Sequence, residues 1–310
     1  MRREIAGLYD HIVPSQILVH TGAEEAIFNF MNDVLQPGDH AIVHWPCYQS
    51  LFEVAHSIGC QVSRWVARPE AGWALDLDWL RDNLRPNTRA VVVNCPHNPT
   101  GYLMSHPAWR ELDRLARQHG FLVFSDEVYR FLEYDAGDRL PAFCDLNERA
   151  VSMGVMSKSF GLAGLRIGWI ATRNKEVYAR MAAFKDYTTI CNPAPSEFLA
   201  ALALRHKEVL WARNRAIIQD NLILLEKFFS CWGDLFGWQP PIAGPVAFPK
   251  MVVPGGVDAF CRRLVADSGV LLLPGRVYGD DYDQHVRIGF GRANMAQSIE
   301  QLEHFLQHVV

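Results

Sequence analysis

The most restrictive feature of this sequence is a series of short apolar segments, each of which ends in a turn or a polar cluster. Stretches with the pattern of amphipathic helices separate these segments, which lie at residues 17–20, 40–44, 90–94, 121–124 and 150–156. Unbroken apolar strands that alternate with helices are typical of a mostly parallel sheet covered by helices on both faces. We therefore predict an α/β fold for this part of the chain.

The pattern changes after about residue 195. A long charged helix is expected at roughly 196–229, followed by turn signals, a helix at 257–268, two short apolar segments and a helix at 297–309. This succession predicts a smaller α+β domain attached by a long helix. A chain of 310 residues is expected to hold about two domains. We place the major domain at 1–200, and the linking helix with the small C-terminal domain at 201–310.

Composition excludes several classes of protein. Hydrophobic residues make up 49% of the chain and charged residues 21%, which is a globular balance. The net charge of -4 gives no reason to expect a nucleic-acid partner. No apolar run approaches the ~20 residues that span a bilayer, and the N-terminus does not look like a secretory signal. The seven cysteines are scattered without a CxxC pair, which argues against disulfides and metal sites and predicts a cytoplasmic protein.

Unusual polar residues follow the predicted strands, where ligands of open parallel sheets bind. The small-residue turn at Thr21–Ala26 predicts a helix start whose free N–H groups can face an anion. Tyr48 follows another strand and can stack on a flat heterocycle. Taken alone, the first also fits an ordinary strand-to-helix turn, and the second fits a core tyrosine.

Two further motifs are more particular. In the NPTG turn, Pro99 restricts Asn98 and Gly101 completes the turn, which holds the Asn98 amide at the sheet edge. Asp126 ends an apolar strand, where a shielded carboxylate needs a cationic partner such as a protonated ring nitrogen. Tyr129 follows within one turn and can face the same ligand. The alternative for Asp126 is a helix cap.

The strongest signal is the segment SKSFGLAGLRIG at 157–168. Lys158 follows an apolar strand, where burial is expected to depress its pKa and to favour a neutral nucleophile that forms an imine. The glycines of the segment allow the loop to approach a ligand closely. Arg166 is an always-charged clamp for an anion. Here a functional interpretation is favoured over a purely structural one.

The chain resembles the pyridoxal-phosphate enzymes of the class I and II aminotransferase family through Tyr48, NPTG, SDEVY, SKSFGLAGLRIG and the late HVRIGF. These motifs occur in the family's order, and the resemblance extends over essentially the whole chain. It implies the fold of aspartate aminotransferase, with a mostly parallel seven-strand sheet between helices and a smaller α+β C-terminal domain. It also implies pyridoxal 5′-phosphate as cofactor, an amino acid and a 2-oxo acid as substrates, and a homodimer.

The resemblance assigns roles to individual residues. Lys158 is expected to form a Schiff base with the cofactor and to move the proton of the substrate Cα. Asp126 is expected to pair with the pyridinium nitrogen. Tyr129 and Asn98 are expected to hydrogen-bond the ring oxygen O3′, and Tyr48 to stack on the ring face.

The same resemblance places the two anionic groups. The partners expected for the cofactor phosphate are the backbone N–H groups of Gly22, Ala23 and Glu24 and the side chains of Ser157 and Arg166. The substrate α-carboxylate is assigned to Arg287 in HVRIGF, beside Asn98. Arg292 is a second candidate, and Arg287 is preferred because it lies within the apolar strand pattern.

The sequence departs from the family's pattern at its start. Only twenty residues precede Thr21, whereas family members carry several tens of residues before this turn. We expect that the arm covering the active site is missing, together with the segment whose tyrosine reaches the phosphate of the neighbouring subunit. Cofactor binding is then expected to survive, and turnover to be the property most affected.

Three functional hypotheses follow. The first is an aminotransferase that moves an amino group between an L-amino acid and a 2-oxo acid. The second is another pyridoxal-phosphate reaction on the same fold, such as a β-eliminating lyase or an amino-acid cyclase. The third is a truncated remnant that binds the cofactor without turnover. The motifs do not choose among the first two, because both begin with removal of the substrate Cα proton.

Overall fold

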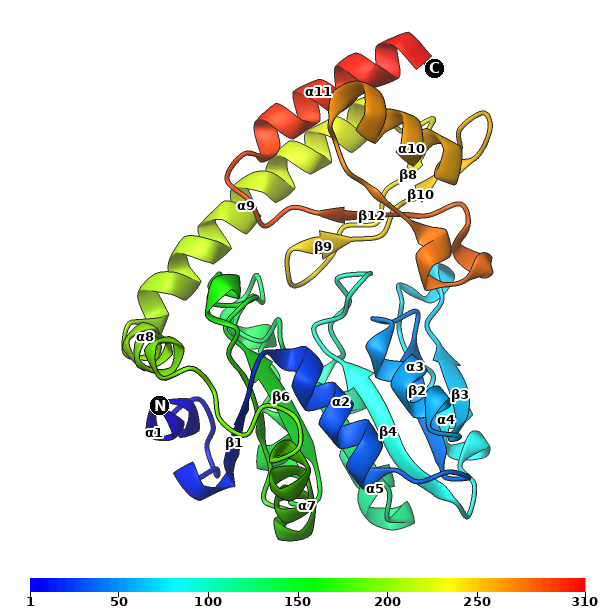
Figure 1. The fold of residues 1–310 in the computed structure, drawn as a ribbon. Coiled ribbons are helices and arrows are strands. Elements are labelled where there is room, and N and C mark those ends of the chain that lie inside the picture. The colour runs from blue at the N-terminus through cyan, green and yellow to red at the C-terminus, as the bar shows by residue number, and fades with distance from the viewer. Residues whose placement is uncertain (310) are drawn as a thin grey trace.

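Seven strands form the central sheet of the computed structural model, which describes residues 1–309 (Figure 1). Their order is β1-β7-β6-β5-β4-β2-β3; β2 to β6 pair in parallel, and β7 is antiparallel to both of its neighbours. The strands are β1 (Ile17–His20), β2 (His40–Trp45), β3 (Gln61–Val66), β4 (Thr88–Asn94), β5 (Leu122–Asp126), β6 (Val151–Val155) and β7 (Gly168–Ala171). The predicted α/β fold with a mostly parallel sheet is confirmed.

Helices flank this sheet, with α2 lying in front of it in Figure 1. They are α1 (Arg2–Ala6), α2 (Ala23–Val34), α3 (Ser50–Ser57), α4 (Leu77–Asn83), α5 (His106–His119), α6 (Phe143–Leu146), α7 (Lys175–Lys185) and α8 (Ala194–Arg205). The strands β2, β5, β6 and β7 are buried along their whole length, as expected for a sheet covered on both faces. The apolar runs of the sequence therefore form the core.

The N-termini of these helices differ in whether a side chain caps them. Asp76, Ser105 and Asn174 cap α4, α5 and α7 by accepting hydrogen bonds from backbone N–H groups in the first turn. In contrast, α2 begins after Gly22 and has no side-chain cap. The first N–H groups of a helix have no intrahelical partner. Those of α2 are therefore available to a ligand.

The remaining part of the chain begins with the long helix α9, which runs away from the sheet (Figure 1). The elements after α9 form a two-stranded antiparallel sheet and a three-stranded sheet of order β11-β12-β9, with two helices beside these sheets. The elements are α9 (Lys207–Cys231), β8 (Phe236–Gly237), β9 (Val246–Ala247), β10 (Lys250–Met251), α10 (Val257–Ser268), β11 (Leu273–Pro274), β12 (Val286–Gly289) and α11 (Met295–Val309). The expected smaller α+β region is confirmed.

Some local predictions were wrong. The single helix expected at 196–229 is two helices, because His206, with φ −108° and ψ 23°, leaves the helical conformation between α8 and α9. The strands β3 and β7 were not predicted. Most residues of β3 are exposed or half-buried, and β7 is only four residues long and begins with glycine. The division placed at residue 200 lies within α8 and stays a prediction.

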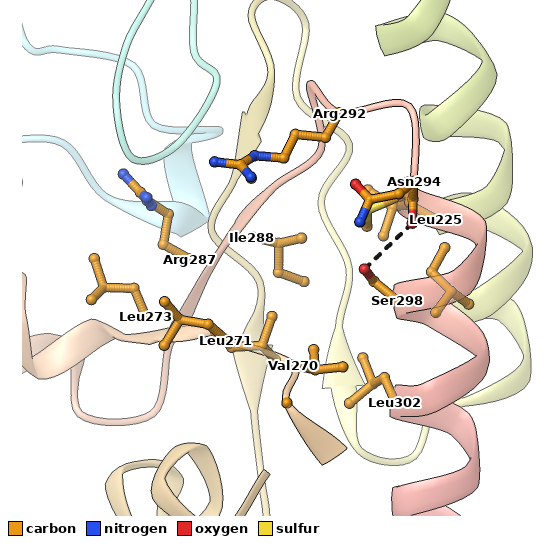
Figure 2. A pocket seen from close by; sticks show the side chains of 15 residues that line it. Leu225, Val270, Leu271, Leu273, Arg287, Ile288, Arg292, Asn294, Ser298 and Leu302 are labelled. Carbon is orange, nitrogen blue, oxygen red and sulfur yellow. Dashed lines mark hydrogen bonds between the residues drawn. The ribbon is translucent and has the colours of Figure 1, made fainter. Parts of the chain in front are cut away.

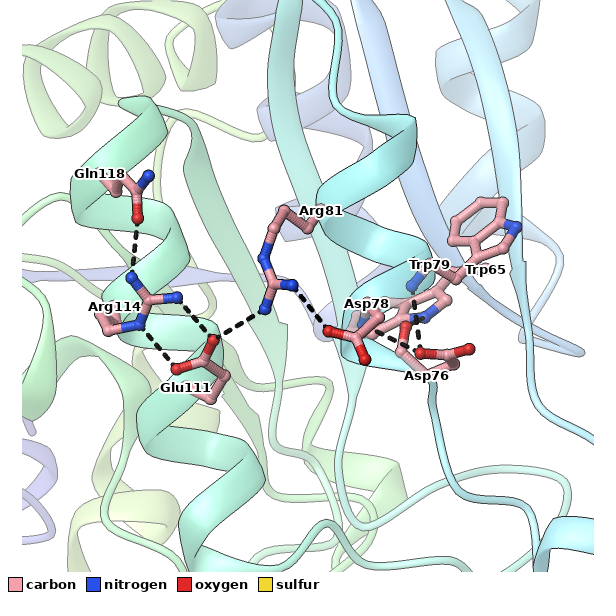
Figure 3. A network of polar contacts seen from close by, with 8 residues as sticks. All are labelled: Trp65, Asp76, Asp78, Trp79, Arg81, Glu111, Arg114 and Gln118. Carbon is pink, nitrogen blue, oxygen red and sulfur yellow. Dashed lines mark hydrogen bonds and ion pairs between the residues drawn. The ribbon is translucent and has the colours of Figure 1, made fainter.

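A polar network on the outer surface joins α4 to α5 (Figure 3). The Arg81 guanidinium lies 2.7 Å from the Asp78 carboxylate and 3.4 Å from that of Glu111, and Glu111 also accepts two hydrogen bonds from Arg114. Such exposed pairs contribute little to stability, typically about 0–1 kcal/mol each. The network links two helices at the surface, and none of its residues lines the cavity described below. Within residues 1–309, no helix has both the length and the apolar character needed to cross a bilayer.

Candidate active site

A cavity of about 230 Å³ lies at the carboxyl ends of the parallel strands. Except for Gly22, which directly precedes α2, the predicted site residues line it: Ala23, Glu24, Tyr48, Asn98, Asp126, Tyr129, Ser157, Lys158, Arg166 and Arg287. Most of these residues lie within residues 23–166, and Arg287 comes from the last strand, β12. The topology of the sheet brings them together because β2, β4, β5 and β6 all end on this side.

The turn between β1 and α2 forms one wall of the cavity. Gly22 has a φ of 88°, which favours glycine, and its N–H donates to the His20 carbonyl at 2.9 Å. The Gly22 N–H is therefore engaged within the turn, and Ala23 and Glu24 provide the free N–H groups of the helix start. This differs from the expectation that all three residues present free N–H groups to an anion.

Arg166 approaches this turn from the lysine loop. A Cβ on Gly22 would lie 2.7 Å from Nη2 of Arg166, so the guanidinium is packed against the glycine. Arg166 has a left-handed backbone conformation, with φ 52° and ψ 47°, and it donates to the Ala163 carbonyl at 3.2 Å. The guanidinium, the Ser157 hydroxyl and the helix N–H groups together form a cup with the charge and donors that an anion requires.

Asp126 ends β5, and its side chain is 4% exposed. Burial raises the pKa of this carboxyl to about 7, although the Val128 N–H donates to its Oδ1 at 3.2 Å and Lys158 favours the charged form. A cationic group placed against Asp126 would stabilise the carboxylate. The alternative of a helix cap does not describe this residue, because no α-helix or 3-10 helix begins directly after it.

Lys158 points into the same cavity and is exposed to solvent through its opening. The expectation that this lysine is buried was therefore wrong. Its pKa is nevertheless lowered, because the surrounding protein partly desolvates the ammonium and the Arg287 guanidinium adds a like charge. Its Nζ lies 5.7 Å from the centroid of the Tyr129 ring, and burial raises the pKa of that phenol. Tyr129 is therefore a neutral hydroxyl at physiological pH.

Asn98 is held by a short chain of hydrogen bonds. Its backbone N–H donates to Oδ1 of Asn94 at 2.7 Å, and Nδ2 of Asn94 donates to the Asp126 carbonyl at 3.0 Å. On the cavity side, Oδ1 of Asn98 accepts from Arg287 at 3.3 Å and lies 3.5 Å from the Tyr278 hydroxyl. Sequence reasoning missed Asn94 and Tyr278. Asn94 begins the NCPHNPTG motif and could have been found there, whereas no sequence signal pointed to Tyr278.

Tyr48 lies at the rim of the cavity and is 45% exposed. Burial and the nearby Glu24 carboxylate raise the pKa of its phenol, which keeps the ring neutral. A half-exposed aromatic ring at a cavity mouth has a free face for another flat ring.

Arg287 and Arg292 differ in position. Arg287 lies in β12, is half-buried and faces Asn98, whereas Arg292 is exposed in the loop after β12. Both line a second cavity of about 390 Å³ between β11, β12 and α11 (Figure 2), but only Arg287 also lines the cavity with Lys158. The preference for Arg287 as the carboxylate partner is consistent with this placement.

Known proteins identify the fold and the family. The family model described as aminotransferase class I and II matches residues 1–309. The chain belongs to this family. Capreomycidine synthase of Streptomyces vinaceus is 32% identical over 278 residues, which cover 89% of this chain and 70% of that protein. Aspartate/prephenate aminotransferase of Thermus thermophilus is 32% identical over 308 residues, which cover 95% of this chain and 76% of that protein.

A solved relative shows the same fold. The crystal structure of a PLP-dependent aminotransferase from Streptococcus suis matches with a TM-score of 0.93 and 32% identity, covering 100% of this chain and 81% of that one. The expected fold of aspartate aminotransferase is thereby confirmed. The chain is therefore an enzyme of a transferase family whose cofactor is pyridoxal phosphate, as the resemblance implied.

The cavity fits the cofactor of this family. Asp126 is a buried carboxyl whose raised pKa a cationic ring nitrogen would lower. The uncapped start of α2 and the Arg166 guanidinium suit a phosphate, and the close contact at Gly22 leaves no room for a side chain there. Lys158 has an amine of lowered pKa within the same space. The donors and charges of the cavity therefore match the ring nitrogen, the phosphate and the aldehyde of pyridoxal phosphate.

Proposed function

We propose that this protein is an aminotransferase that moves an amino group between an L-amino acid and a 2-oxo acid. The observation that carries the proposal is the meeting of Lys158, Asp126 and Arg287 at one cavity. This reaction needs an amine that can carry a proton, a partner for the ring nitrogen and a partner for the carboxylate. Lys158, Asp126 and Arg287 supply these groups in that order.

Each residue has a distinct part in the proposed reaction. When bound, pyridoxal phosphate supplies an electron sink for the negative charge that develops at the substrate Cα. Lys158 Nζ would take the proton from the substrate Cα and deliver it to the cofactor carbon C4′, and its lowered pKa increases the neutral fraction that can accept a proton. The Asp126 carboxylate holds the proton on the ring nitrogen. Arg287 binds the substrate α-carboxylate, and Asn98 orients the Arg287 guanidinium.

The remaining residues orient the ligands. We assign the phosphate to the cup formed by Ser157, Arg166 and the first N–H groups of α2, with Gly22 shaping the turn. Tyr48 covers one face of the ring, and the Tyr129 hydroxyl and Asn98 amide bind its O3′. These contacts keep the substrate Cα close to Lys158, and a fixed geometry of this kind supports proton transfer between positioned groups.

A half-reaction tests the proposal. The protein loaded with pyridoxal phosphate is mixed with single amino acids in the absence of a 2-oxo acid, and the products are identified by mass spectrometry. We expect pyridoxamine phosphate and one equivalent of a 2-oxo acid for the preferred amino acids. Release of ammonia with a 2-oxo acid, while the cofactor remains pyridoxal phosphate, would contradict transamination. A loaded protein that converts no amino acid would favour the remnant without turnover.

A cyclase is the second candidate, and the relationship to capreomycidine synthase favours it. Cyclisation also begins with removal of the Cα proton, so the same Lys158, Asp126 and Arg287 would serve both reactions. The half-reaction separates the two. A product that retains every nitrogen of the amino acid, formed over many turnovers without a 2-oxo acid, would support the cyclase.

We also propose that the enzyme is a cytoplasmic homodimer. Several large apolar side chains within residues 187–209 are exposed, which is typical of a surface that contacts another protein: Tyr187, Ile190, Phe198, Leu199, Leu202 and Val209. All seven cysteines are free, which suits a reducing compartment. The division into a major domain over 1–200 and a small domain over 201–310 remains part of this proposal.

A further inference from the structure

Glu25 has contacts that the reaction proposed above does not use. Its side chain is only 9% exposed, and its Oε2 accepts a hydrogen bond from the Thr21 N–H at 2.6 Å. Its Oε1 accepts from the hydroxyls of Thr188 and Thr189, each at 2.6 Å, and lies 3.8 Å from Nζ of Lys185. One carboxylate therefore joins the β1–α2 turn, the last residue of α7 and the segment after it.

The charge of Glu25 is balanced inside the protein. Burial acts to raise the pKa of this carboxyl, but hydrogen bonds from Thr188, Thr189 and Thr21 outweigh it and lower the pKa. Burial lowers the pKa of the neighbouring His20 to about 4, so its ring is neutral at pH 7. Lys185, whose side chain is 6% exposed, supplies the balancing positive charge. A buried pair of this kind is costly to break from one side.

This carboxylate also determines which N–H groups face the cavity. Glu25 engages the Thr21 N–H and the His20 carbonyl engages the Gly22 N–H, so the next free donors belong to Ala23 and Glu24. Asn192 supports the same turn by donating to the Thr21 hydroxyl at 3.2 Å. The orientation of the turn therefore depends on contacts that reach it from the segment after α7.

We propose that Glu25 is a positioning residue for the cofactor phosphate. By fastening the β1–α2 turn to Lys185, Thr188 and Thr189, it keeps the Ala23 and Glu24 N–H groups directed at the phosphate. This inference rests on the proposed function, in which the start of α2 binds that group. Glu25 itself does not line the cavity, so the role inferred for it is positioning and not direct contact.

Electrostatics and positioning predict opposite effects of the same substitution. Glu25→Gln removes a negative charge near the phosphate and leaves the positive charge of Lys185 uncompensated. Long-range charge alone would therefore strengthen phosphate binding. Positioning predicts weaker binding, because the amide cannot replace both carboxylate oxygens as acceptors for three donors. The direction in which phosphate binding changes therefore distinguishes positioning from long-range charge.

The experiment measures dissociation constants of the apoprotein for pyridoxal phosphate and for pyridoxal, which lacks the phosphate. For Glu25→Gln we expect about tenfold weaker binding of pyridoxal phosphate, the effect of losing a hydrogen bond to a charged group, and unchanged binding of pyridoxal. Asp33→Asn is the matched control, because Asp33 pairs with Arg180 at 3.6 Å between the same two helices, α2 and α7, far from the cup. We expect both of its constants to equal those of the parent.

A second variant removes the donors without changing the charge. Thr188→Val with Thr189→Val should weaken pyridoxal phosphate binding in the same direction as Glu25→Gln, and thermal unfolding of each apoprotein identifies any variant that fails to fold. Unchanged or tighter binding of pyridoxal phosphate by both variants would overturn the inference, as would an equal loss of pyridoxal. If the parent chain itself bound no pyridoxal phosphate, the proposed function would fail instead.

Discussion

At the scale of single residues, Asp126 is the clearest case in which burial disfavours the charge that the proposed function requires. A buried carboxyl with one hydrogen bond from the backbone and a pKa of about 7 contributes less to folding than a neutral side chain of the same shape. Such a group is expected where function requires its charge. The effect of this carboxyl on the free energy of unfolding can be measured in the apoprotein at different pH values.

We predict that Asp126→Asn stabilises the apoprotein at pH 8 and has little effect at pH 4. The folded pKa of Asp126 is about 7, against 3.8 for an exposed aspartate, so the folded state binds more protons in this range. The contribution of this group to stability is therefore lost as the pH rises from about 4 to 7. Asp126→Asn therefore avoids a decrease of up to about 4 kcal/mol in the free energy of unfolding. Thermal unfolding at both pH values measures the difference, and equal shifts at pH 4 and pH 8 would contradict the raised pKa.

Lys158→Ala tests the assignment of the nucleophile. We expect the purified parent chain, incubated with pyridoxal phosphate, to show a visible absorption band from the Schiff base. The band should vanish in the variant, because the methyl side chain has no amine. Lys185→Ala would be a poor control, since Lys185 supports Glu25; Lys175→Ala, at the start of α7, should keep the band. A band that survives in Lys158→Ala would place the Schiff base on another lysine.

The two arginines near the small sheet can also be compared directly. Arg287→Ala should raise the KM for the amino acid on the order of 100-fold, because a charge-assisted pair with the carboxylate is lost. Arg292→Ala should change it less, since this exposed side chain does not line the cavity of Lys158. Steady-state kinetics on both variants measure the effect. A larger rise for the Arg292 variant would reverse the assignment.

At the scale of elements, the sequence predicted the ends of strands but not the break within the long helical stretch. The motifs after β4, β5 and β6 could be placed because an apolar run followed by a polar cluster marks where a strand stops. The break at His206 could not be placed, since the residues on both sides form helix and no glycine or proline marks the break. The role of Tyr278 was equally hidden, because it reaches Asn98 from a distant part of the chain. Long-range contacts of this kind leave no local pattern.

The packing of β7 against the β1–α2 turn leads to a prediction about two glycines. A Cβ on Gly168 would lie 2.6 Å from the Gly22 carbonyl carbon, so Gly168→Ala must displace the turn. We expect a loss of about 1–3 kcal/mol in the free energy of unfolding and weaker binding of pyridoxal phosphate. Gly164→Ala is the control, because no atom lies within 4 Å of the added methyl group. Urea unfolding and cofactor titration of both variants measure these effects, and equal behaviour of the two would contradict a close contact at Gly168.

At the scale of the whole molecule, the exposed apolar side chains between residues 187 and 209 need an explanation. Tyr187 is 89% exposed, Phe198 71% and Ile190 69%. Ile190 also has a φ of 59°, a conformation that a β-branched residue adopts only when its surroundings hold it there. The same segment contributes Thr188 and Thr189 to the contacts of Glu25. The proposed dimer surface and the phosphate cup are therefore physically connected.

This connection predicts that dissociating the dimer weakens cofactor binding. Phe198→Lys with Leu202→Lys introduces two charges on exposed positions of α8, where desolvation on association would be unfavourable. We expect sedimentation to give twice the chain mass for the parent and the chain mass for the variant. Because the 186–192 segment supports the turn at Thr21, we also expect the monomeric variant to bind pyridoxal phosphate less tightly. Leu271→Lys, at a 75% exposed position outside residues 187–209, should leave mass and affinity unchanged. A parent chain that sediments as a monomer would contradict the proposed dimer. A monomeric variant that binds the cofactor as tightly as the dimeric parent would show that the site is complete within one subunit.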